Sequence, residues 1–196
     1  MQTLTRRAVL AAGTLAAGLI PRKPRAAEPA GLQGLHVLTP PKPLPALRFH
    51  TATGQVQTLD TYRGQGVVLN LWATWCPPCV AELPSLDALA RQLRGSHIAV
   101  LAVSSDLGGA PAVQRFYASH HITDLPVLLD PDGTLLQALG ARGVPTTYLI
   151  TPQGTETAWI EGAQPWATPA SLARVKALVG KQARPGGAAP WTPAKG

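Results

Sequence analysis

The two cysteines of this 196-residue chain are Cys76 and Cys79, and they are separated by Pro77 and Pro78. A Cys-x-x-Cys pair that follows a buried strand and opens a helix is typical of a redox-active disulfide. At a helix N-terminus the aligned peptide dipoles favour the thiolate form of Cys76. The prolines suit the first helical turn, because its N–H groups have no intrahelical partner to lose. The motif predicts a disulfide that closes and reopens by exchange.

Three other uses of the pair are possible. An inert structural disulfide is common in exported proteins, but one that closes almost no loop gains little stability. A zinc site normally needs four ligands. The histidines are His36, His50, His97, His120 and His121. They show no His-x₃₋₅-His spacing, so we expect no metal site and no cofactor. A Cu(I) carrier that uses both cysteines as soft ligands remains an alternative.

The elements around the cysteines alternate between strand and helix. An apolar run over 67–72 predicts a central strand buried on both faces, and a leucine stripe predicts a helix over 77–94. Further strands are expected at 98–103, 127–129, 146–150 and 155–160, further helices at 111–120, 135–139 and 169–179, and a leading hairpin at 47–50 and 55–59. This order predicts an α/β fold, a mixed sheet with helices on both faces.

The two ends of the chain differ from its body. Arg6 and Arg7 precede an apolar run over 8–20, so residues 1–27 are typical of an export signal of the twin-arginine kind. The run is shorter than the roughly 20 residues of a membrane-spanning helix, so membrane association would come only through an uncleaved signal. Residues 28–45 are expected to form an irregular lead-in, and 181–196 a disordered tail.

The charge distribution excludes a nucleic-acid binder. The formal net charge of the chain is +7. The span 28–180, however, holds nine basic against ten acidic residues. A body with this balance lacks the basic surface that phosphate binding needs.

Residues 46–180 resemble the thioredoxin superfamily and, within it, the exported TlpA/ResA-like thiol-disulfide oxidoreductases. The resemblance rests on Trp75-Cys76-Pro77-Pro78-Cys79, on Pro84 five residues later, and on Gly143-Val144-Pro145-Thr146-Thr147. It implies a thioredoxin-like domain with an N-terminal hairpin and a central strand-helix insert. It also implies a cis bond before Pro145.

The resemblance also implies roles for individual residues. A client protein would contact Trp75, Pro77, Pro78, Val144 and Pro145. Simple packing is the alternative for Trp75.

A further acid is implied next to the cysteines. Thioredoxins have a buried acid where this chain has Asn70, whereas the TlpA/ResA group has a glutamate at the position of Glu82. Cys79 and Glu82 lie three residues apart, on one helix face. Burial would raise the pKa of Glu82 and let it take the proton of Cys79. The alternative is an ordinary surface glutamate, since glutamate is seldom buried.

The implied activity is the reduction of disulfides in client proteins outside the cytoplasm, in the periplasm or its equivalent. The family's clients include apocytochrome c, hence cytochrome c biogenesis, and copper-site proteins, and it is linked to antioxidant activity. A membrane thiol-disulfide electron donor would restore the dithiol. A disulfide-donating oxidase of the DsbA kind is the alternative in which electrons flow the other way.

Overall fold

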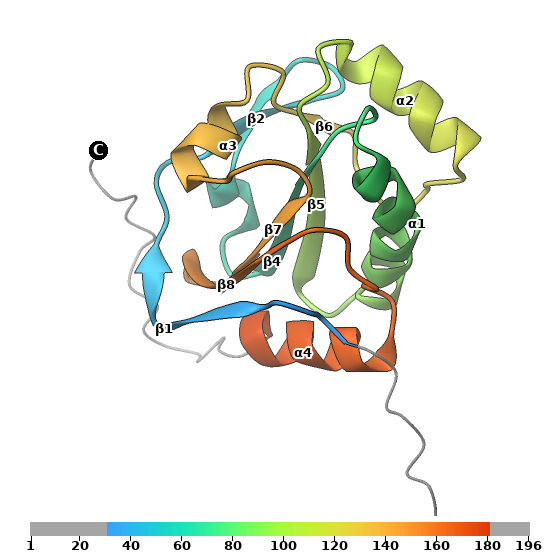
Figure 1. Ribbon diagram of the computed structural model, residues 1–196. Coiled ribbons are helices and arrows are strands. Elements are labelled where there is room, and N and C mark those ends of the chain that lie inside the picture. The colour runs from blue at the N-terminus through green and yellow to red at the C-terminus, as the bar shows by residue number, and fades with distance from the viewer. Residues whose placement is uncertain (1–30, 181–196) are drawn as a thin grey trace, which may run out of the picture.

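The computed structural model describes residues 31–180 (Figure 1). Its strands are β1 (His36–Pro43), β2 (Arg48–Thr51), β3 (Val56–Thr58), β4 (Gly66–Trp72), β5 (Ile98–Ser104), β6 (Leu128–Leu129), β7 (Thr146–Ile150) and β8 (Thr155–Glu161). Its helices are the 3₁₀ helix η1 (Leu59–Tyr62) and the α-helices α1 (Pro77–Gln92), α2 (Gly109–Ser119), α3 (Thr134–Leu139) and α4 (Pro169–Val179). The predicted mixed sheet with flanking helices is confirmed. The predicted signal and tail lie outside the described residues.

Strand β4 lies at the centre of the sheet and positions the cysteines at its end. The strand order is β1-β8-β7-β4-β5-β6-β2-β3, with β4 parallel to β5 and antiparallel to β7. All seven residues of β4 are buried, as expected of a strand covered on both faces. The chain leaves β4 at Trp72 and enters α1 at Pro77, so the motif follows the best-buried strand.

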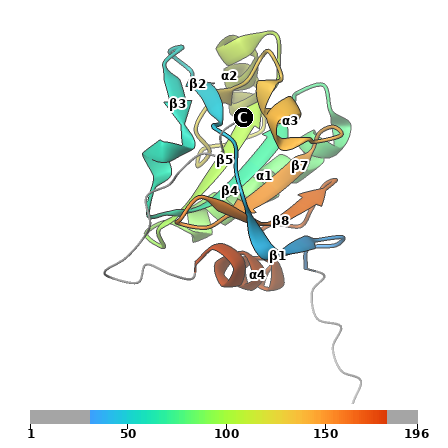
Figure 2. The same cartoon turned by 90° about the vertical axis from the view of Figure 1, so that its left-hand side faces the viewer.

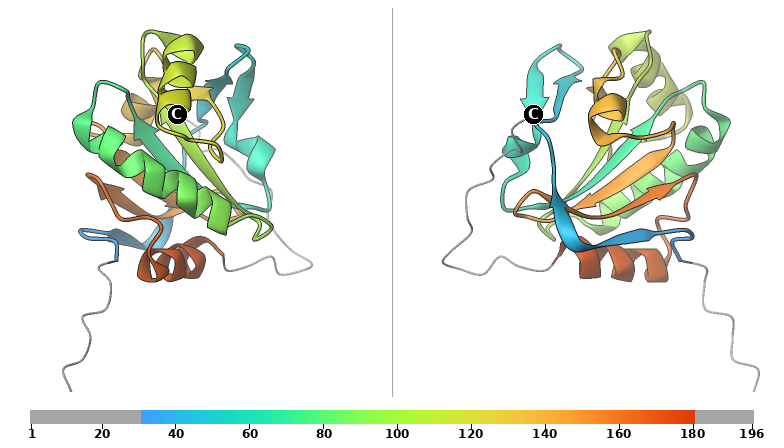
Figure 3. Two further views of the ribbon diagram at one scale, coloured as in Figure 1. Left: turned by 90° about the vertical axis from the view of Figure 1, so that its right-hand side faces the viewer. Right: turned by 60° about the vertical axis from the view of Figure 1, so that its left-hand side comes forward.

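Each face of the sheet has its own hydrophobic core. Helices α1, α2 and α4 cover one face, on which Val68 and Trp72 of β4 are buried. Helix α3, the 3₁₀ helix η1 and the segment 44–47 cover the other face, on which Leu69 and Leu71 are buried. Figure 3 shows α1 and α2 on the same side of the sheet. Since successive side chains of a strand point to opposite faces, β4 connects both cores.

Helix α1 buries the predicted leucine stripe. Leu83, Leu86 and Leu89 have no exposed surface. Pro84 lies inside the helix and cannot donate the hydrogen bond that a helical N–H would make to Val80. The helix therefore packs along one apolar face, and Cys79 and Glu82 lie in its buried first turns.

The lead-in predicted to be irregular over 28–45 is a strand over His36–Pro43, so that prediction is wrong there. β1 pairs antiparallel with β8, and its register shifts between Val37 and Lys42. Proline has no N–H to donate and is confined to sheet edges or bulges, and the prolines at 40 and 41 fall within this shift at an edge of the sheet. These prolines are the reason that the local sequence did not predict a strand here.

The segment 44–47 then carries the chain across the sheet towards the hairpin of β2 and β3. Leu44 and Leu47 are each 2% exposed and belong to the core on the α3 face. Figure 2 shows the chain running from β1 up to β2, which pairs with β6. The predicted hairpin is confirmed, and it extends the sheet at the edge opposite β1.

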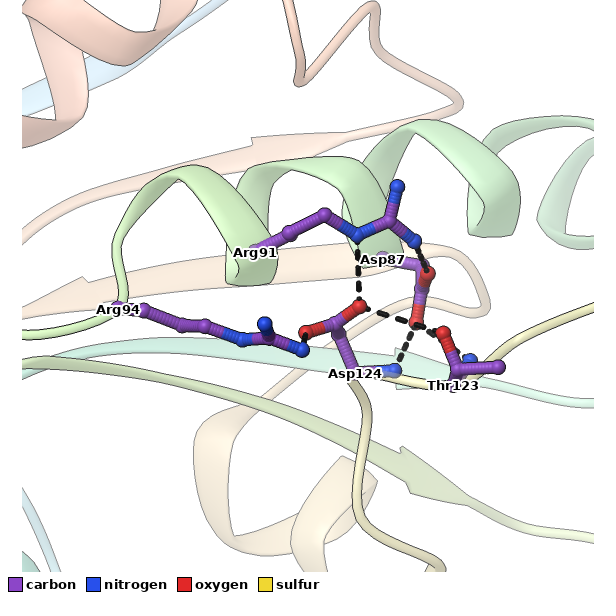
Figure 4. Close-up of polar contacts among 5 residues, drawn as sticks. All are labelled: Asp87, Arg91, Arg94, Thr123 and Asp124. Carbon is purple, nitrogen blue, oxygen red and sulfur yellow. Dashed lines mark hydrogen bonds and ion pairs between the residues drawn. The ribbon is translucent and has the colours of Figure 1, made fainter.

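Between β5 and β7, where the strand-helix insert is expected, the chain forms α2, β6 and α3. We call this region the insert, and its loop between α2 and β6 is fastened to α1. Asp87 accepts hydrogen bonds from the backbone N–H groups of Thr123 at 3.0 Å and Asp124 at 2.6 Å. Arg91 contacts both Asp87 and Asp124, and Arg94 also contacts Asp124 (Figure 4). These contacts hold the insert against the helix that carries the cysteines.

Candidate active site

The two cysteines form a disulfide at the start of α1, with their Cα atoms 5.3 Å apart. Cys76 is the N-cap residue, and its Sγ accepts a hydrogen bond from the backbone N–H of Cys79 at 3.3 Å. Cys76 is 4% exposed, whereas Cys79 has no exposed surface. Of the two sulfurs, that of Cys76 is therefore the one an incoming disulfide can reach.

The residues around Cys76 form a partly apolar surface. Pro77 and Pro78 are exposed at the first two positions of α1. Trp75 is 66% exposed, so packing in the core does not account for it. Trp72, by contrast, is fully buried, as expected for a core residue. The side chains next to the accessible sulfur are thus available for contact with another molecule.

The loop before β7 faces the disulfide. The Val144–Pro145 peptide bond is cis, which confirms the expectation from the sequence. The carbonyl oxygen of Val144 lies 3.6 Å from Cys76 Sγ. Thr146 Oγ1 donates to the carbonyl of Gly143 at 2.7 Å, and the N–H of Gly162 donates to the carbonyl of Pro145 at 2.9 Å. The loop is thus fixed on both sides of the bond that faces the sulfur.

Glu82 is buried beneath the motif, with 3% of its surface exposed. Its Oε1 accepts from Asn70 Nδ2 at 3.0 Å. Its Oε2 accepts from the backbone N–H of Gln164 and from Trp166 Nε1, each at 3.0 Å. Burial raises the pKa of this carboxyl, against the opposing effect of these three hydrogen bonds. The surface alternative for Glu82 is therefore wrong.

Asn70 connects Glu82 to the strand after the cis proline. Its Nδ2 also donates to Thr147 Oγ1 at 2.8 Å, while its Oδ1 is buried without a hydrogen-bond partner. Asn70 cannot exchange a proton, yet it holds the carboxylate that can. The buried acid of this site thus lies on α1, and the residue of β4 beside it is its hydrogen-bond donor.

Two residues of this network were missed in the sequence, Gln164 and Trp166. They lie in the segment between β8 and α4, more than 80 positions from Glu82 along the chain. No local pattern distinguishes them there, because their role depends on the segment between β8 and α4 returning to contact α1, where Ser85 bonds to the backbone of both residues. Trp166 is fully buried, so its N–H needs an acceptor in the interior.

Within residues 31–180, no group of three or more His, Cys, Asp or Glu side chains could hold a metal ion. In the same part of the chain, no helix combines the length and apolar character needed to cross a bilayer.

Known proteins are similar to this chain over the part that holds the cysteines. The AhpC/TSA family model matches residues 40–156. Thiol-disulfide oxidoreductase ResA of Oceanobacillus iheyensis is 36% identical over 54% of this chain and 54% of its own length. The ResA of Bacillus subtilis is 33% identical over 56% of this chain and 60% of its own. The chain thus spans little more than half the length of these relatives.

A solved structure is similar over nearly its whole length. The exposed lipoprotein thioredoxin Etrx1 of Streptococcus pneumoniae strain TIGR4 is 31% identical, with a TM-score of 0.58 over 68% of this chain and 99% of that one. The fold is thioredoxin-like, and the family match covers the cysteine pair, Glu82 and the cis proline. This chain is a member of the AhpC/TSA family.

Proposed function

We propose that this protein is an extracytoplasmic thiol-disulfide oxidoreductase that reduces disulfides in client proteins. The observation that carries the proposal is the small exposed surface of Cys76, 4%, at a helix N-cap opposite the Val144 carbonyl, with Cys79 fully buried behind it. One sulfur is placed to meet a client, and the other can be reached only from within the protein. The ResA relatives, named thiol-disulfide oxidoreductases, support this activity.

The reaction has two exchange steps. In the dithiol form, the Cys76 thiolate attacks one sulfur of a client disulfide, and the other client sulfur leaves as a thiolate. Cys79 then loses its proton and attacks Cys76 Sγ, which releases the second client sulfur. The client gains two electrons and the Cys76–Cys79 pair loses two. The Cys79 N–H donated to Cys76 Sγ stabilises the attacking thiolate.

Glu82 is the base for the second step. It lies one helical turn beyond Cys79, and its raised pKa suits a carboxylate that must accept a proton from a thiol. All three of its donors, Asn70, Gln164 and Trp166, are uncharged. They hold the carboxylate in place without a cation that would lower its basicity further.

The client lies across Trp75, Pro77 and Pro78 and along Val144 and Pro145. Because the Val144 carbonyl faces the reactive sulfur, an extended client segment can pair with this short stretch of backbone. We place the protein outside the cytoplasm, with apocytochrome c or copper-site proteins as clients. A membrane thiol-disulfide electron donor returns the pair to the dithiol.

The reduction potential of the pair tests the direction of electron flow. We expect a value near that of thioredoxin, about −270 mV, in glutathione or dithiothreitol buffers. A value near that of DsbA, about −120 mV, would make the protein a disulfide donor instead. Stoichiometric Cu(I) on the purified reduced protein, together with slow exchange, would instead indicate a metal carrier.

Trapping tests the order of attack. A Cys79→Ala variant retains the accessible sulfur and lacks the second, so it should accumulate disulfide-linked client adducts. Cys76→Ala is the matched control, because its remaining sulfur is buried and should capture none. Equal capture by the two variants would contradict the assignment of Cys76 as the attacking residue.

A further inference from the structure

A buried aspartate fastens the loop that precedes Cys76. Asp106 is 4% exposed and follows β5. Its carboxylate accepts hydrogen bonds from the backbone N–H of Thr74 at 2.8 Å and from Thr74 Oγ1 at 2.5 Å. Ser104 Oγ donates to the same carboxylate at 2.5 Å and accepts from the Asp106 N–H at 3.1 Å. We call these contacts the Thr74–Asp106–Ser104 network.

The network holds the part of the turn that core packing holds least, because Ala73 and Cys76 on either side are buried whereas Thr74 is only partly buried and Trp75 is exposed. Thr74 directly precedes Trp75, which is 66% exposed, and Cys76, the N-cap of α1. The turn from Ala73 to Cys76 contributes one more bond, from the Cys76 N–H to the Ala73 carbonyl at 3.2 Å. The position of the Trp75 backbone therefore depends on polar contacts made one residue before it.

We infer that Asp106 is a positioning residue for client attack. Through Thr74 it fixes where Trp75 and Cys76 meet the client, although it takes no part in the exchange itself. This inference rests on the proposed function, because positioning matters only if a client occupies this surface. A loop misplaced by a fraction of an ångström would slow attack on a client that must be held in one geometry.

Asp130 provides a chemically matched comparison. It is 5% exposed and accepts from the backbone N–H of Thr134 at 3.0 Å and from Thr134 Oγ1 at 2.7 Å. It also accepts from the N–H of Leu135 at 2.8 Å. Both aspartates thus bind an N–H and the hydroxyl of one threonine, but Asp130 caps α3 on the other face of the sheet.

The experiment compares Asp106→Asn with Asp130→Asn, and Thr74→Val with Thr134→Val. Thr74→Ser, which keeps the hydroxyl, is the rescue variant. The second-order rate of each reduced protein is measured with a disulfide-bonded peptide and with a small aromatic disulfide, which needs no extended contact. Amide hydrogen exchange of residues 73–76 is followed in the same proteins.

We expect Asp106→Asn and Thr74→Val to lower the peptide rate on the order of tenfold, with the small-disulfide rate within about twofold of wild type. Exchange at 73–76 should rise in these two variants and stay unchanged in the Asp130, Thr134 and Thr74→Ser proteins. If Asp106→Asn reduces the peptide at the wild-type rate and loses as much stability as Asp130→Asn, Asp106 has only a structural role. Unchanged amide hydrogen exchange at residues 73–76 in Asp106→Asn would lead to the same conclusion.

A failure of the proposed function looks different. A wild-type protein that reduces neither disulfide refutes the proposed activity, and with it a positioning role in client attack. A wild-type protein that reduces both, with variants that behave alike, refutes only the inference about Asp106.

Discussion

Helix α1 carries two carboxylates that are equally buried and differently paired. Glu82 and Asp87 are each 3% exposed. Asp87 accepts from two backbone N–H groups of the insert and from the Arg91 guanidinium at 3.0 Å (Figure 4). The carboxylate thus joins the loop after α2 to the helix through two backbone donors and a cation. Its contacts are those of an anchor.

Glu82 has the same burial without a cation. Its donors within the described chain are an amide, a backbone N–H and an indole, and burial raises the pKa of the carboxyl. Buried acids therefore need to be distinguished by their partners. A buried carboxylate with a cationic partner is expected to have a structural role, whereas one with only neutral donors can accept a proton.

The largest expected contrast is in catalysis. Glu82→Gln should slow the conversion of the mixed disulfide to products by about 100-fold or more, because a positioned base contributes at least that much. Asp87→Asn should leave this step within about twofold of wild type. Acid-quenched single turnovers with a disulfide peptide measure the step. Equal rates in the two variants would remove the proposed distinction.

The next contrast is in stability, where the change at Asp87 should have the larger effect and the change at Glu82 the smaller one. Asp87→Ala leaves two backbone N–H groups and a guanidinium without their acceptor, so it should lower the free energy of unfolding by about 2–3 kcal/mol. Urea unfolding measures the loss as a lower midpoint with an unchanged m-value. A cost below that of Glu82→Gln would show that Asp87 does not anchor the insert.

The pH dependence of the free energy of unfolding tests the raised pKa of Glu82. The pKa of Glu82 is raised in the folded protein above its ordinary value of 4.5. The stabilising contribution of its protonated form is therefore complete below pH 4.5 and is lost as the pH rises through the folded pKa. The stability of wild type relative to Glu82→Gln should fall with increasing pH in this window. Denaturation curves at a series of pH values measure it, and a difference that grows with pH would contradict the assignment.

The smallest effect is expected at the exposed side of the anchor. The Arg91 side chain is 54% exposed, so water and salt screen its ion pairs. Arg91→Met should cost much less stability than Asp87→Ala. The cost should vanish between 0.1 and 1 M salt, because the Debye length falls from about 10 to about 3 Å over that range. Urea midpoints at the two salt concentrations provide the measurement. A loss that persists at high salt would mean that the stem of Arg91, rather than its charge, supports the insert.

The sequence predicts the part of the site that is local. Cys76 and Cys79 lie between a strand and a helix whose patterns are unambiguous, and Glu82 follows within one turn. Pro145 required a resemblance to a family, because base rates alone do not favour a cis bond. The order of the elements follows from their hydrophobic periodicity, which depends on short stretches of chain.

The rest depends on packing between distant segments. Trp166 reaches Glu82 only because the segment between β8 and α4 returns to α1, and Asp106 reaches Thr74 only because β4 and β5 are parallel neighbours. Strand β1 was missed for a different reason, since its prolines oppose strand formation locally and are tolerated only at a sheet edge.

Those prolines have a consequence for a protein that would handle partly unfolded chains. Such chains expose strands that can pair with any open sheet edge and aggregate there. In the described part of the molecule one outer strand is β1, with proline at 40, 41 and 43, and the other is β3, only three residues long. Both edge strands of the sheet are therefore poor templates for pairing with an unfolded chain. If the proposed function holds, the short backbone stretch at Val144 is the place where a client chain would pair with the protein and be reduced.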